Sequence, residues 1–491
     1  MPSISRAGVS INIGGIDAAI VIVYMLAVLA LGVWIGRGRQ TAARYFLGDR
    51  SLPWGALLLS IVATETSTVT FLSIPGLAAA AGGNLTFLQI TFGYIVGRLG
   101  VIFVLLPLYF RGKPFTAYEV LETRFGTLSR RLVSSLFLLT RNASDALRLF
   151  LTALVLQIVL GLDLGISVMV IGVVTILYTF IGGARSVIWN DSIQFVIYML
   201  GAVAAAAIIV GATPGGLDAL AAFAHDEGKL QVFDFDVSLV KPGMTFWAGL
   251  AGGAFLTAAT HGTDQMMVQR YLSAKSQGQA SLALGLSGFI VLAQFALFLL
   301  IGVGLASLLA DAAEPLRNDQ LFAYFIVHYM PVGLLGFTLA AVFAAAMSTL
   351  SSSLNSSAAA YINDIWRPLR ASEPDEATTL RTSRAATIVF GLVQTGIALG
   401  FGMLVTNESI VANVLKISGF AAGPVLGLYF LGVFAPRVRQ GAALAGFAVG
   451  VVVLSTVAYT TPVHWAWYAL LGSMTTFAAG SLAGRITGLA R

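Results

Sequence analysis

The sequence contains no cysteine, which excludes disulfides, thiolate metal sites and cysteine-based catalysis. Charged residues are also scarce. They make up 10% of the 491 residues, whereas soluble globular proteins carry roughly 25%. The four histidines form no HExxH motif. The low charge content excludes a water-soluble globular protein. Without cysteine or an HExxH motif, the sequence shows no recognisable set of catalytic residues, so we do not expect an enzyme.

Long apolar runs are what the sequence has instead. Apolar residues make up 57% of the chain and the mean hydropathy is +0.88. A bilayer core takes about 20 apolar residues per helix. We therefore expect an all-α integral membrane protein with 13 transmembrane helices, near residues 16–36, 52–80, 85–109, 132–160, 163–183, 188–212, 243–269, 278–308, 332–360, 385–405, 410–434, 441–459 and 464–484. The first run has no small-residue cleavage site after it, so we interpret it as a retained helix.

The basic residues follow this pattern of spans. Most of the 28 lysines and arginines fall in every second loop, within 37–50, 111–131, 185, 270–275, 367–384, 437–439 and 485–491. The alternate set holds Arg6, Lys229, Lys241 and Arg317. The positive-inside rule then predicts a multi-pass protein of the cell (inner) membrane with its amino terminus outside and its carboxyl terminus cytoplasmic. The positive charge is accounted for by topology, so no nucleic-acid partner is expected.

The second span is unusually polar at mid-membrane. The stretch 64–70 reads Thr-Glu-Thr-Ser-Thr-Val-Thr, and a Pro-Gly pair follows at 75–76. One or two such hydroxyls can bond back to their own helix. This density instead predicts a discontinuous helix whose freed carbonyls and hydroxyls line a buried site.

The ninth span carries a face of small and hydroxyl residues. Ala345, Ser348, Thr349 and Ser352 stand at i, i+3, i+4 and i+7. Tight helix packing through small residues is one interpretation. The other is a cation site, because a hard cation such as sodium prefers oxygen ligands. At 1.5 Å per residue, this face and the polar stretch of the second span reach one level just inside the midplane.

The seventh span has a second polar break, around 257–265. The two interrupted spans are five apart and cross the membrane in opposite directions. Spans 2–6 and 7–11 therefore match two halves of an inverted repeat, with a substrate site where the broken helices meet.

Four stretches together resemble the sodium/solute symporter family, which includes the sodium–glucose and sodium–sialic acid transporters. They are 63–76, 181–194, 269–275 and 348–365. The resemblance implies a LeuT-like five-plus-five inverted repeat in a single transporter domain, 1–491. An extra first helix (16–36) would precede the first repeat (52–212) and the second repeat (243–434), and two last helices with a cytoplasmic tail (441–491) would follow.

The resemblance also implies binding residues. The main sodium site would be formed by Ala63, Thr66, Ala345, Ser348 and Thr349. A second sodium would be held by Asp191, Ser348, Ser351 and Ser352, although a helix-start acid such as Asp191 is also favoured by the helix dipole alone. The substrate region would include Ser67, Thr70, Gln89, Thr91, Thr263, Asp264 and Gln265.

One position departs from the sialic acid branch. Where that branch has a carboxylate-binding arginine in the fourth span, this sequence has Ser144. Arg141 and Arg148 lie nearby, and either can bind a carboxylate bidentately. Asp145 between them can equally form an internal ion pair with one or both. The substrate therefore stays open between a sugar, a sugar acid such as sialic acid, and another carboxylate.

The function predicted is sodium-coupled symport of a small polar organic solute by alternating access, with one or two sodium ions. The alternative is a proton-coupled carrier that uses Glu65 or Asp264 as its titrating group. The expected partners are the solute, sodium and the lipid bilayer, and the protein is expected to function as a monomer.

Overall fold

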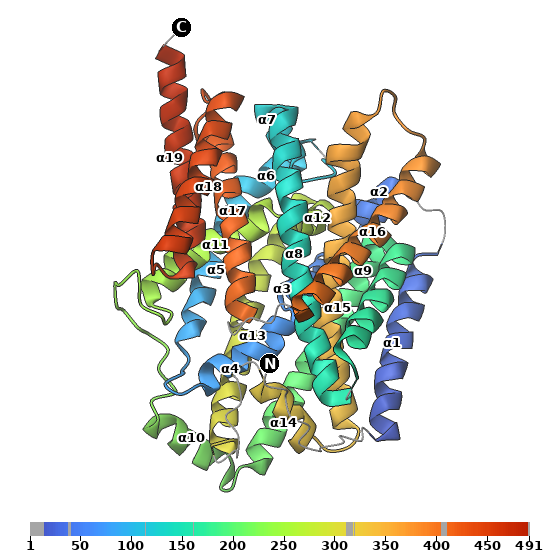
Figure 1. Ribbon diagram of the computed structural model, residues 1–491, viewed down its shortest axis with the longest axis vertical. Helices are drawn as coiled ribbons and strands as arrows, with labels where there is room; N and C mark the ends of the chain where they lie inside the picture. Colours follow the sequence, from blue (N-terminus) through green and yellow to red (C-terminus); the bar gives the residue numbers. More distant parts are fainter. Residues whose placement is uncertain are drawn as a thin grey trace.

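A computed structural model describes residues 14–489 except 38–40, 113, 161, 311–317, 319 and 404–409. The described residues form helices joined by loops, and one isolated β-bridge joins Leu52 to Ala274. The long helices run broadly parallel in one bundle (Figure 1). Their bounds are α1 Gly15–Ile35, α2 Ala42–Leu47, α3 Trp54–Glu65, α4 Thr68–Ala79, α5 Gln89–Gly100, α6 Leu106–Gly112, α7 Glu119–Phe125, α8 Thr127–Leu160, α9 Leu164–Ala212, α10 Gly216–Asp226, α11 Gly253–Thr263, α12 Gln265–Leu272, α13 Gln277–Leu308, α14 Leu321–Tyr329, α15 Leu334–Ala360, α16 Glu376–Met403, α17 Ile410–Phe434, α18 Gln440–Thr460 and α19 Tyr468–Leu489.

Each predicted span overlies helix in the structure. By length and apolar character, seven of the described helical segments are able to cross a membrane, or eight if α3 and α4 count as one bent span. The other predicted spans fall on helices that are shorter, interrupted or more polar. The protein is thus an all-helical, multi-pass membrane protein.

The predicted spans 163–183 and 188–212 are one helix, α9, bent at Gly183. Gly183 has φ 60° and ψ −167°, a conformation that strongly favours glycine. It also lies against α2, since a β-carbon there would come within 2.6 Å of the Tyr45 carbonyl oxygen. Glycine therefore allows both the bend and the close approach of the two segments.

Both predicted interruptions are present. The second span divides into α3 and α4, which meet at 58°, with Thr66 and Ser67 in extended backbone between them. The seventh span divides at Asp264, whose φ of −80° and ψ of 126° separate α11 from α12. The Asp264 side chain accepts a hydrogen bond from the backbone N–H of Met266 (2.8 Å), which caps α12.

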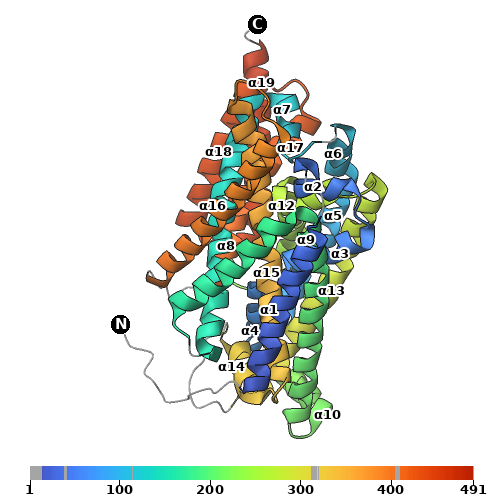
Figure 2. The same ribbon diagram turned by 90° about the vertical axis from the view of Figure 1, so that its right-hand side faces the viewer.

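Helix α15 runs through the middle of the bundle, and almost all of its residues are buried. Figure 2 shows α1 beside α9 and α15. The buried Asp17 of α1 accepts hydrogen bonds from the backbone N–H groups of Gly333 (2.7 Å) and Gly336 (2.8 Å). This carboxylate caps the start of α15 and fastens the peripheral first helix to the central one.

Two short helices, α10 and α14, lie in the loops between predicted spans. Figure 1 places both at one end of the bundle and α7 at the other. Helix α14 packs on α4 through Phe322 and Phe71, whose ring centroids are 5.4 Å apart. The loop ends of the bundle are therefore partly helical.

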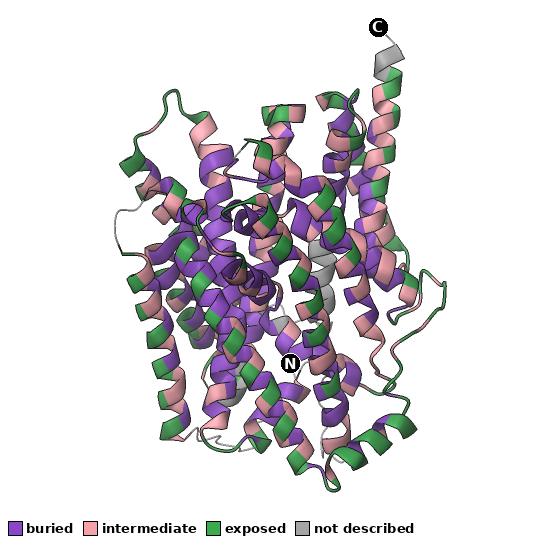
Figure 3. Cartoon of the chain, turned by 180° about the vertical axis from the view of Figure 1, so that it is seen from behind, coloured by how far each residue is buried: buried purple, intermediate pink, exposed green. Residues whose placement is uncertain are grey.

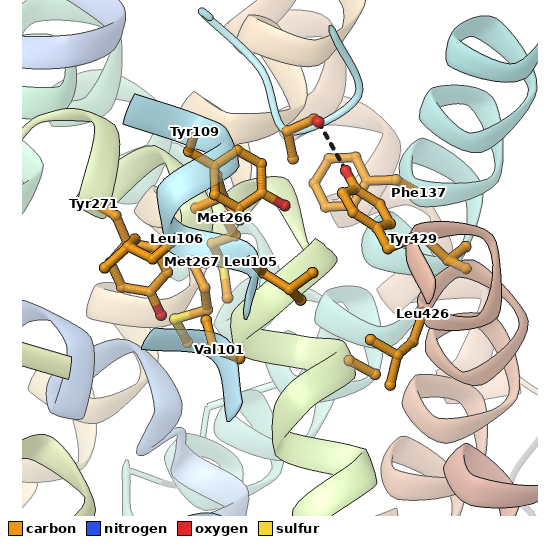
Figure 4. Packing of buried hydrophobic residues seen from close by; sticks show 14 of the residues in the cluster. Val101, Leu105, Leu106, Tyr109, Phe137, Met266, Met267, Tyr271, Leu426 and Tyr429 are labelled. Atoms are coloured by element: carbon orange, nitrogen blue, oxygen red, sulfur yellow. Dashed lines mark hydrogen bonds between the residues drawn. The ribbon is translucent and has the colours of Figure 1, made fainter. Parts of the chain in front are cut away.

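Apolar packing holds the broken helices in place. Figure 4 shows Met266, Met267 and Tyr271 of α12 packed near Leu105 and Tyr109, with residues of α8 and α17 beside them. Exposed residues lie mainly along the outer faces of the peripheral helices and at the ends of the bundle (Figure 3), as expected where such faces meet lipid.

Candidate functional site

A cavity of about 180 Å³ lies where the two broken helices meet. Its walls come mainly from the α3–α4 break, α8, the α11–α12 break and α17. About half of the lining residues are polar or charged, namely Thr64, Glu65, Ser67, Thr70, Thr140, Arg141, Ser144, Arg148, Thr260, His261, Thr263 and Asp264. The others are apolar or aromatic and include Phe87, Tyr94, Phe137, Leu256 and Phe295.

Two arginines of α8 share one carboxylate in this cavity. Arg141 binds the buried Asp145 with Nε and Nη2, each at 2.6 Å, and its Nη1 lies 3.5 Å from Asp264. Arg148 contacts the same Asp145 through Nη1. No described residue accepts a hydrogen bond from the buried Nε of Arg148. Arg141 therefore contacts two carboxylates, Asp145 and Asp264, whereas Arg148 contacts Asp145 alone through Nη1.

A second charged group connects the two breaks. Glu65 ends α3 and pairs with the buried Arg98 of α5. Arg98 Nη2 also lies 3.3 Å from Nε2 of His261 on α11, and His261 Nδ1 lies 2.8 Å from the Tyr271 hydroxyl. A neutral imidazole protonated on Nδ1 satisfies both contacts, because it donates to Tyr271 and accepts from Arg98.

The hydroxyl face of α15 lies against the end of α3. Ser348 Oγ donates to the carbonyl of Ala63 at 3.0 Å and lies 3.1 Å from the carbonyl of Ala345. Thr349 Oγ1 lies 3.1 Å from the carbonyl of Thr64. The break of α3 leaves carbonyls without helical partners, and the α15 hydroxyls bind them. Hydroxyl and carbonyl oxygens thus converge in the buried interior, a donor set suited to a hard cation.

The predicted residue Thr66 stands at the same break. Its side chain pairs with Gln294 of α13, with distances of 3.0 and 2.8 Å to the two amide atoms. Its backbone is extended rather than helical. The Thr66 side chain is therefore committed to Gln294, which leaves its backbone carbonyl for any cation.

Asp191 of α9 lies deeper in the bundle, in contact with four side chains. Its Oδ2 accepts from Ser60 Oγ at 2.7 Å and lies 3.2 Å from Thr64 Oγ1 and 3.3 Å from Ser352 Oγ. Arg270 Nη2 lies 2.9 Å from the same oxygen. No described residue donates to Asp191 Oδ1, which is also buried. Asp191 Oδ2 therefore has four partners among the described residues, whereas Oδ1 has none.

Arg270 was missed as a functional residue from the sequence. It stands one position beyond the predicted seventh span, among loop charges that the positive-inside rule already explained. The α11–α12 break turns the chain so that Arg270 is 3% exposed. In the sequence, burial of Arg270 could have been inferred only from its position about two helical turns after the polar break at Asp264.

Three predicted substrate residues do not line the cavity in the described structure. Gln89 donates to the carbonyls of Thr86 (3.0 Å) and Met244 (2.9 Å) and accepts from the N–H of Asp234. Thr91 Oγ1 donates to the carbonyl of Leu88 at 2.7 Å. Gln265 binds the backbone of the loop before α7. Each of these side chains is engaged in holding neighbouring segments together.

Ser351 Oγ lies 3.3 Å from the carbonyl of Ser348, one turn earlier on α15. Within the described ranges, no group of three or more histidine, aspartate or glutamate side chains is placed to hold a metal ion. The candidate cation ligands are therefore mostly hydroxyls and carbonyls.

The fold and the site define a helical membrane transporter with two broken helices around a buried cavity. A family model described as the sodium:solute symporter family matches residues 45–450, so the chain belongs to that family. It is a sodium-coupled transporter and not an enzyme.

Relatives and solved structures agree with this assignment. The sodium/sialic acid symporter SiaT of Proteus mirabilis is 29% identical over 96% of this chain and 95% of its own length. Sodium-coupled monocarboxylate transporter 2 of Bos taurus is 29% identical over 88% of this chain and 70% of its own. A substrate-bound, outward-open sodium-coupled sialic acid symporter superposes with a TM-score of 0.89 at 28% identity, covering 97% of this chain and 98% of that one.

More distant structures share the fold. MHP1, a nucleobase-cation-symport-1 family transporter, has a TM-score of 0.61 at 14% identity over 92% of this chain and 96% of its own. The LeuT-like fold is thus common to transporters with unrelated substrates.

Proposed function

We propose that the protein uses the sodium gradient to take up a small organic carboxylate. The observation that carries this proposal is the meeting of Ser348 and Thr349 with the freed carbonyls of Ala63 and Thr64. That meeting point adjoins a cavity whose wall contains Arg148. A site for a cation and a site for an anion therefore lie side by side, in one buried region.

The proposed topology has 13 spans, an outside amino terminus and a cytoplasmic carboxyl terminus. Helices α3–α9 and α11–α17 form the two inverted repeats, which begin with the broken helices α3–α4 and α11–α12. The arrangement in Figure 1 supports this topology, because α10 and α14 belong to predicted outside loops and α7 to a predicted cytoplasmic loop. The repeats, with α1 before and α18 and α19 after, form one domain that works as a monomer in the bilayer.

The main sodium ion would bind between α3 and α15. The proposed ligands are the carbonyls of Ala63, Thr66 and Ala345 and the hydroxyls of Ser348 and Thr349. The hydroxyls already lie within 3.1 Å of carbonyls of α3. Sodium would draw the same oxygens together, so binding joins the broken helix to α15.

A second sodium ion would bind at Asp191. The buried Oδ1 supports this proposal, since an unpartnered carboxylate oxygen in the interior is costly unless a cation meets it. Ser348, Ser351 and Ser352 of α15 would supply further oxygens. Arg270 contacts the other carboxylate oxygen, Oδ2. The site therefore accommodates the sodium ion and the Arg270 guanidinium together only when they bind different oxygens of Asp191.

The solute carboxylate would bind Arg148 rather than Arg141. Arg141 already spends Nε and Nη2 on Asp145 and places Nη1 near Asp264. Arg148 lines the cavity and contacts Asp145 through Nη1, so its guanidinium has further donors for a carboxylate. Ser67, Thr70 and Thr263 would contact the polar part of the solute, and Asp264 would hold Arg141 away from it.

The cavity limits the rest of the solute. Its volume of about 180 Å³ corresponds to roughly a dozen water-sized positions. Phe87, Phe137 and Phe295 add apolar surface to the cavity that the charged groups also line. We therefore favour a carboxylate with a compact, partly apolar body over a bare sugar. Curated relatives named for sialic acid and for monocarboxylates fit this range.

Transport would proceed by alternating access. Sodium binds from outside and orders Ser67 and Thr70 beside the break, so each ligand binds more tightly when the other is present. Rocking of the repeats then exposes the site to the cytoplasm. The membrane potential contributes about 2.3 kcal/mol per charge for each 100 mV.

Proton coupling is less well supported by the geometry. Glu65 is paired with Arg98, and Asp264 lies 3.5 Å from Arg141. Both candidate proton carriers are therefore in contact with an arginine side chain. Uptake of radiolabelled carboxylates into proteoliposomes tests the choice, with an inward gradient of sodium, of potassium or of protons. Uptake is expected with the sodium gradient and not with the potassium or proton gradient. Uptake that follows the proton gradient without sodium would overturn the proposal.

A further inference from the structure

A second, smaller cavity lies beside the Asp191–Arg270 pair. Its volume is about 10 Å³, room for about one water molecule. It is lined by Ala184, Val187, Ile188, Gln269, Arg270, Ser352 and Asn355. Among the described residues, none lines both this cavity and the larger one. The two spaces are therefore separate in this structure.

Arg270 stands between them. Its Nε lies 2.9 Å from Ser60 Oγ on α3, and its Nη1 donates to the carbonyl of Met266 on its own helix at 2.5 Å. Its Nη2 contacts Asp191, Thr64 and Ser352. Thr64 lines the larger cavity, whereas Ser352 lines the smaller one. One guanidinium thus joins α3, α9, α12 and α15 and separates the two cavities.

Helix α2 contacts two of the residues that line the small cavity, Gln269 and Asn355. Gln269 Nε2 donates to the carbonyl of Phe46 at 2.6 Å and to Asn355 Oδ1 at 2.8 Å. Tyr45 and Phe46 are completely buried. The bend of α9 at Gly183 packs directly against Tyr45. Helix α2 therefore packs between the wall of the small cavity and the bend of α9.

Thr64 connects this region to the proposed sodium site. Its carbonyl is bound by the Thr349 hydroxyl at 3.1 Å, and its own hydroxyl is in contact with Arg270. Thr349, one of the proposed sodium ligands, thus contacts a residue that Arg270 also contacts. The proposed sodium site and the Arg270 contacts therefore share Thr64.

We propose that Arg270 and α2 gate a separate cytoplasmic exit for sodium, which passes Asp191 and the small cavity while the solute leaves through the large one. This inference rests on the proposed function. In the closed gate the guanidinium acts as a tethered cation that keeps Asp191 neutralised after sodium leaves. An unpaired buried carboxylate would otherwise be strongly destabilising.

The absence of native cysteine makes the route directly testable. A single cysteine placed by Val187→Cys lines the small cavity. In inside-out vesicles, a membrane-impermeant cationic thiol reagent is expected to label it at least fivefold faster with Arg270→Gln than with Arg270 intact. Modification should slow ²²Na⁺ release at least fivefold, while solute exchange at saturating sodium on both sides changes less than twofold.

A second readout is sodium leak. Arg270→Gln is expected to raise solute-independent ²²Na⁺ flux at least fivefold. The matched control is Arg124→Gln, whose arginine binds the carbonyls of Ala435 and Pro436 on a different helix pair and should leave the leak unchanged. If Arg270→Gln does not fold, Gln269→Ala, which releases the Phe46 carbonyl, should produce the same faster labelling.

The outcomes separate the gate from the proposed function. If no carboxylate stabilises the unmodified protein in a sodium-dependent way, the proposed function fails. If stabilisation is sodium-dependent but Val187→Cys is labelled no faster in either gate variant, the gate proposal is overturned. Equal slowing of sodium release and solute exchange after modification would also overturn it, because both ligands would then share one route.

Discussion

The hydroxyl of Thr349 lies 3.1 Å from the backbone carbonyl of Thr64, a residue 285 positions away in the sequence. Ser348 makes the matching contact with Ala63 at 3.0 Å. These two bonds join the end of a broken helix to the centre of the bundle. A cation bound among their oxygens would decide how firmly the two elements are held, which is how sodium can control access to the cavity.

Removing a hydroxyl from this meeting point should weaken sodium binding. Thr349→Ala and Ser348→Ala are each expected to raise the sodium concentration for half-maximal uptake at least tenfold, equivalent to about 1.4 kcal/mol. The control is Ser356→Ala, because Ser356 bonds to the Ser353 carbonyl of its own helix at 3.1 Å. Unchanged sodium dependence in both test variants would refute the main sodium site.

The two arginines of α8 should behave differently. Arg148→Gln is expected to weaken carboxylate binding at least a hundredfold, about 2.7 kcal/mol, while sodium alone still stabilises the protein. Arg141→Gln leaves the buried Asp145 with one partner fewer and should mainly lower the Tm. Calorimetric titration and thermal unfolding measure the two effects. The assignment is wrong if Arg148→Gln binds the carboxylate normally.

The second cation site predicts a change in stoichiometry. Dual-label uptake of ²²Na⁺ and ¹⁴C-carboxylate should give two sodium ions per solute for the unmodified protein and one for Asp191→Asn. The electrical driving force for uptake would be halved in Asp191→Asn, since each sodium ion carries one charge across the membrane potential. A ratio of one that Asp191→Asn does not alter would eliminate this site.

The contact between α1 and α15 predicts a loss of stability. Asp17→Ala removes the acceptor for two backbone N–H groups at the start of α15. The expected destabilisation is about 1–2 kcal/mol, seen as a lower Tm in detergent. Asp218→Ala, at the exposed first turn of α10, is the control and should leave the Tm unchanged. An equal Tm for both variants would argue against the contact.

The broken helices could be predicted from sequence because their cause is local. Six hydroxyl or carboxyl side chains within 64–70 cannot face lipid, and a polar break such as Thr263–Asp264 has the same consequence. The α15 face was likewise visible in its i, i+3, i+4 spacing. The long-range partners of these residues were not. Gln89 is engaged by Met244 and Asp234, which only the folded loop brings near.

Arg270 shows the same limit. The sequence placed it in a cytoplasmic loop, but the turn at Asp264 directs α12 back into the bundle and buries it beside Asp191. The pairing of Asp145 with both Arg141 and Arg148 was an open alternative that depends on side-chain geometry. Spacing along a helix identified the candidates without showing which of them retains a free donor.

Sodium and a carboxylate are expected to bind cooperatively. The most direct measurement is thermal unfolding of the purified protein in sodium or in potassium, with a panel of monocarboxylates, sugar acids, sugars and amino acids. A ligand that binds only the folded state raises its stability by RT ln(1 + [L]/Kd). We predict that one or more carboxylates raise the Tm in sodium and not in potassium. If sodium has no effect on the Tm, alone or with any solute, sodium does not bind at the α3–α15 contact and is not coupled to the solute.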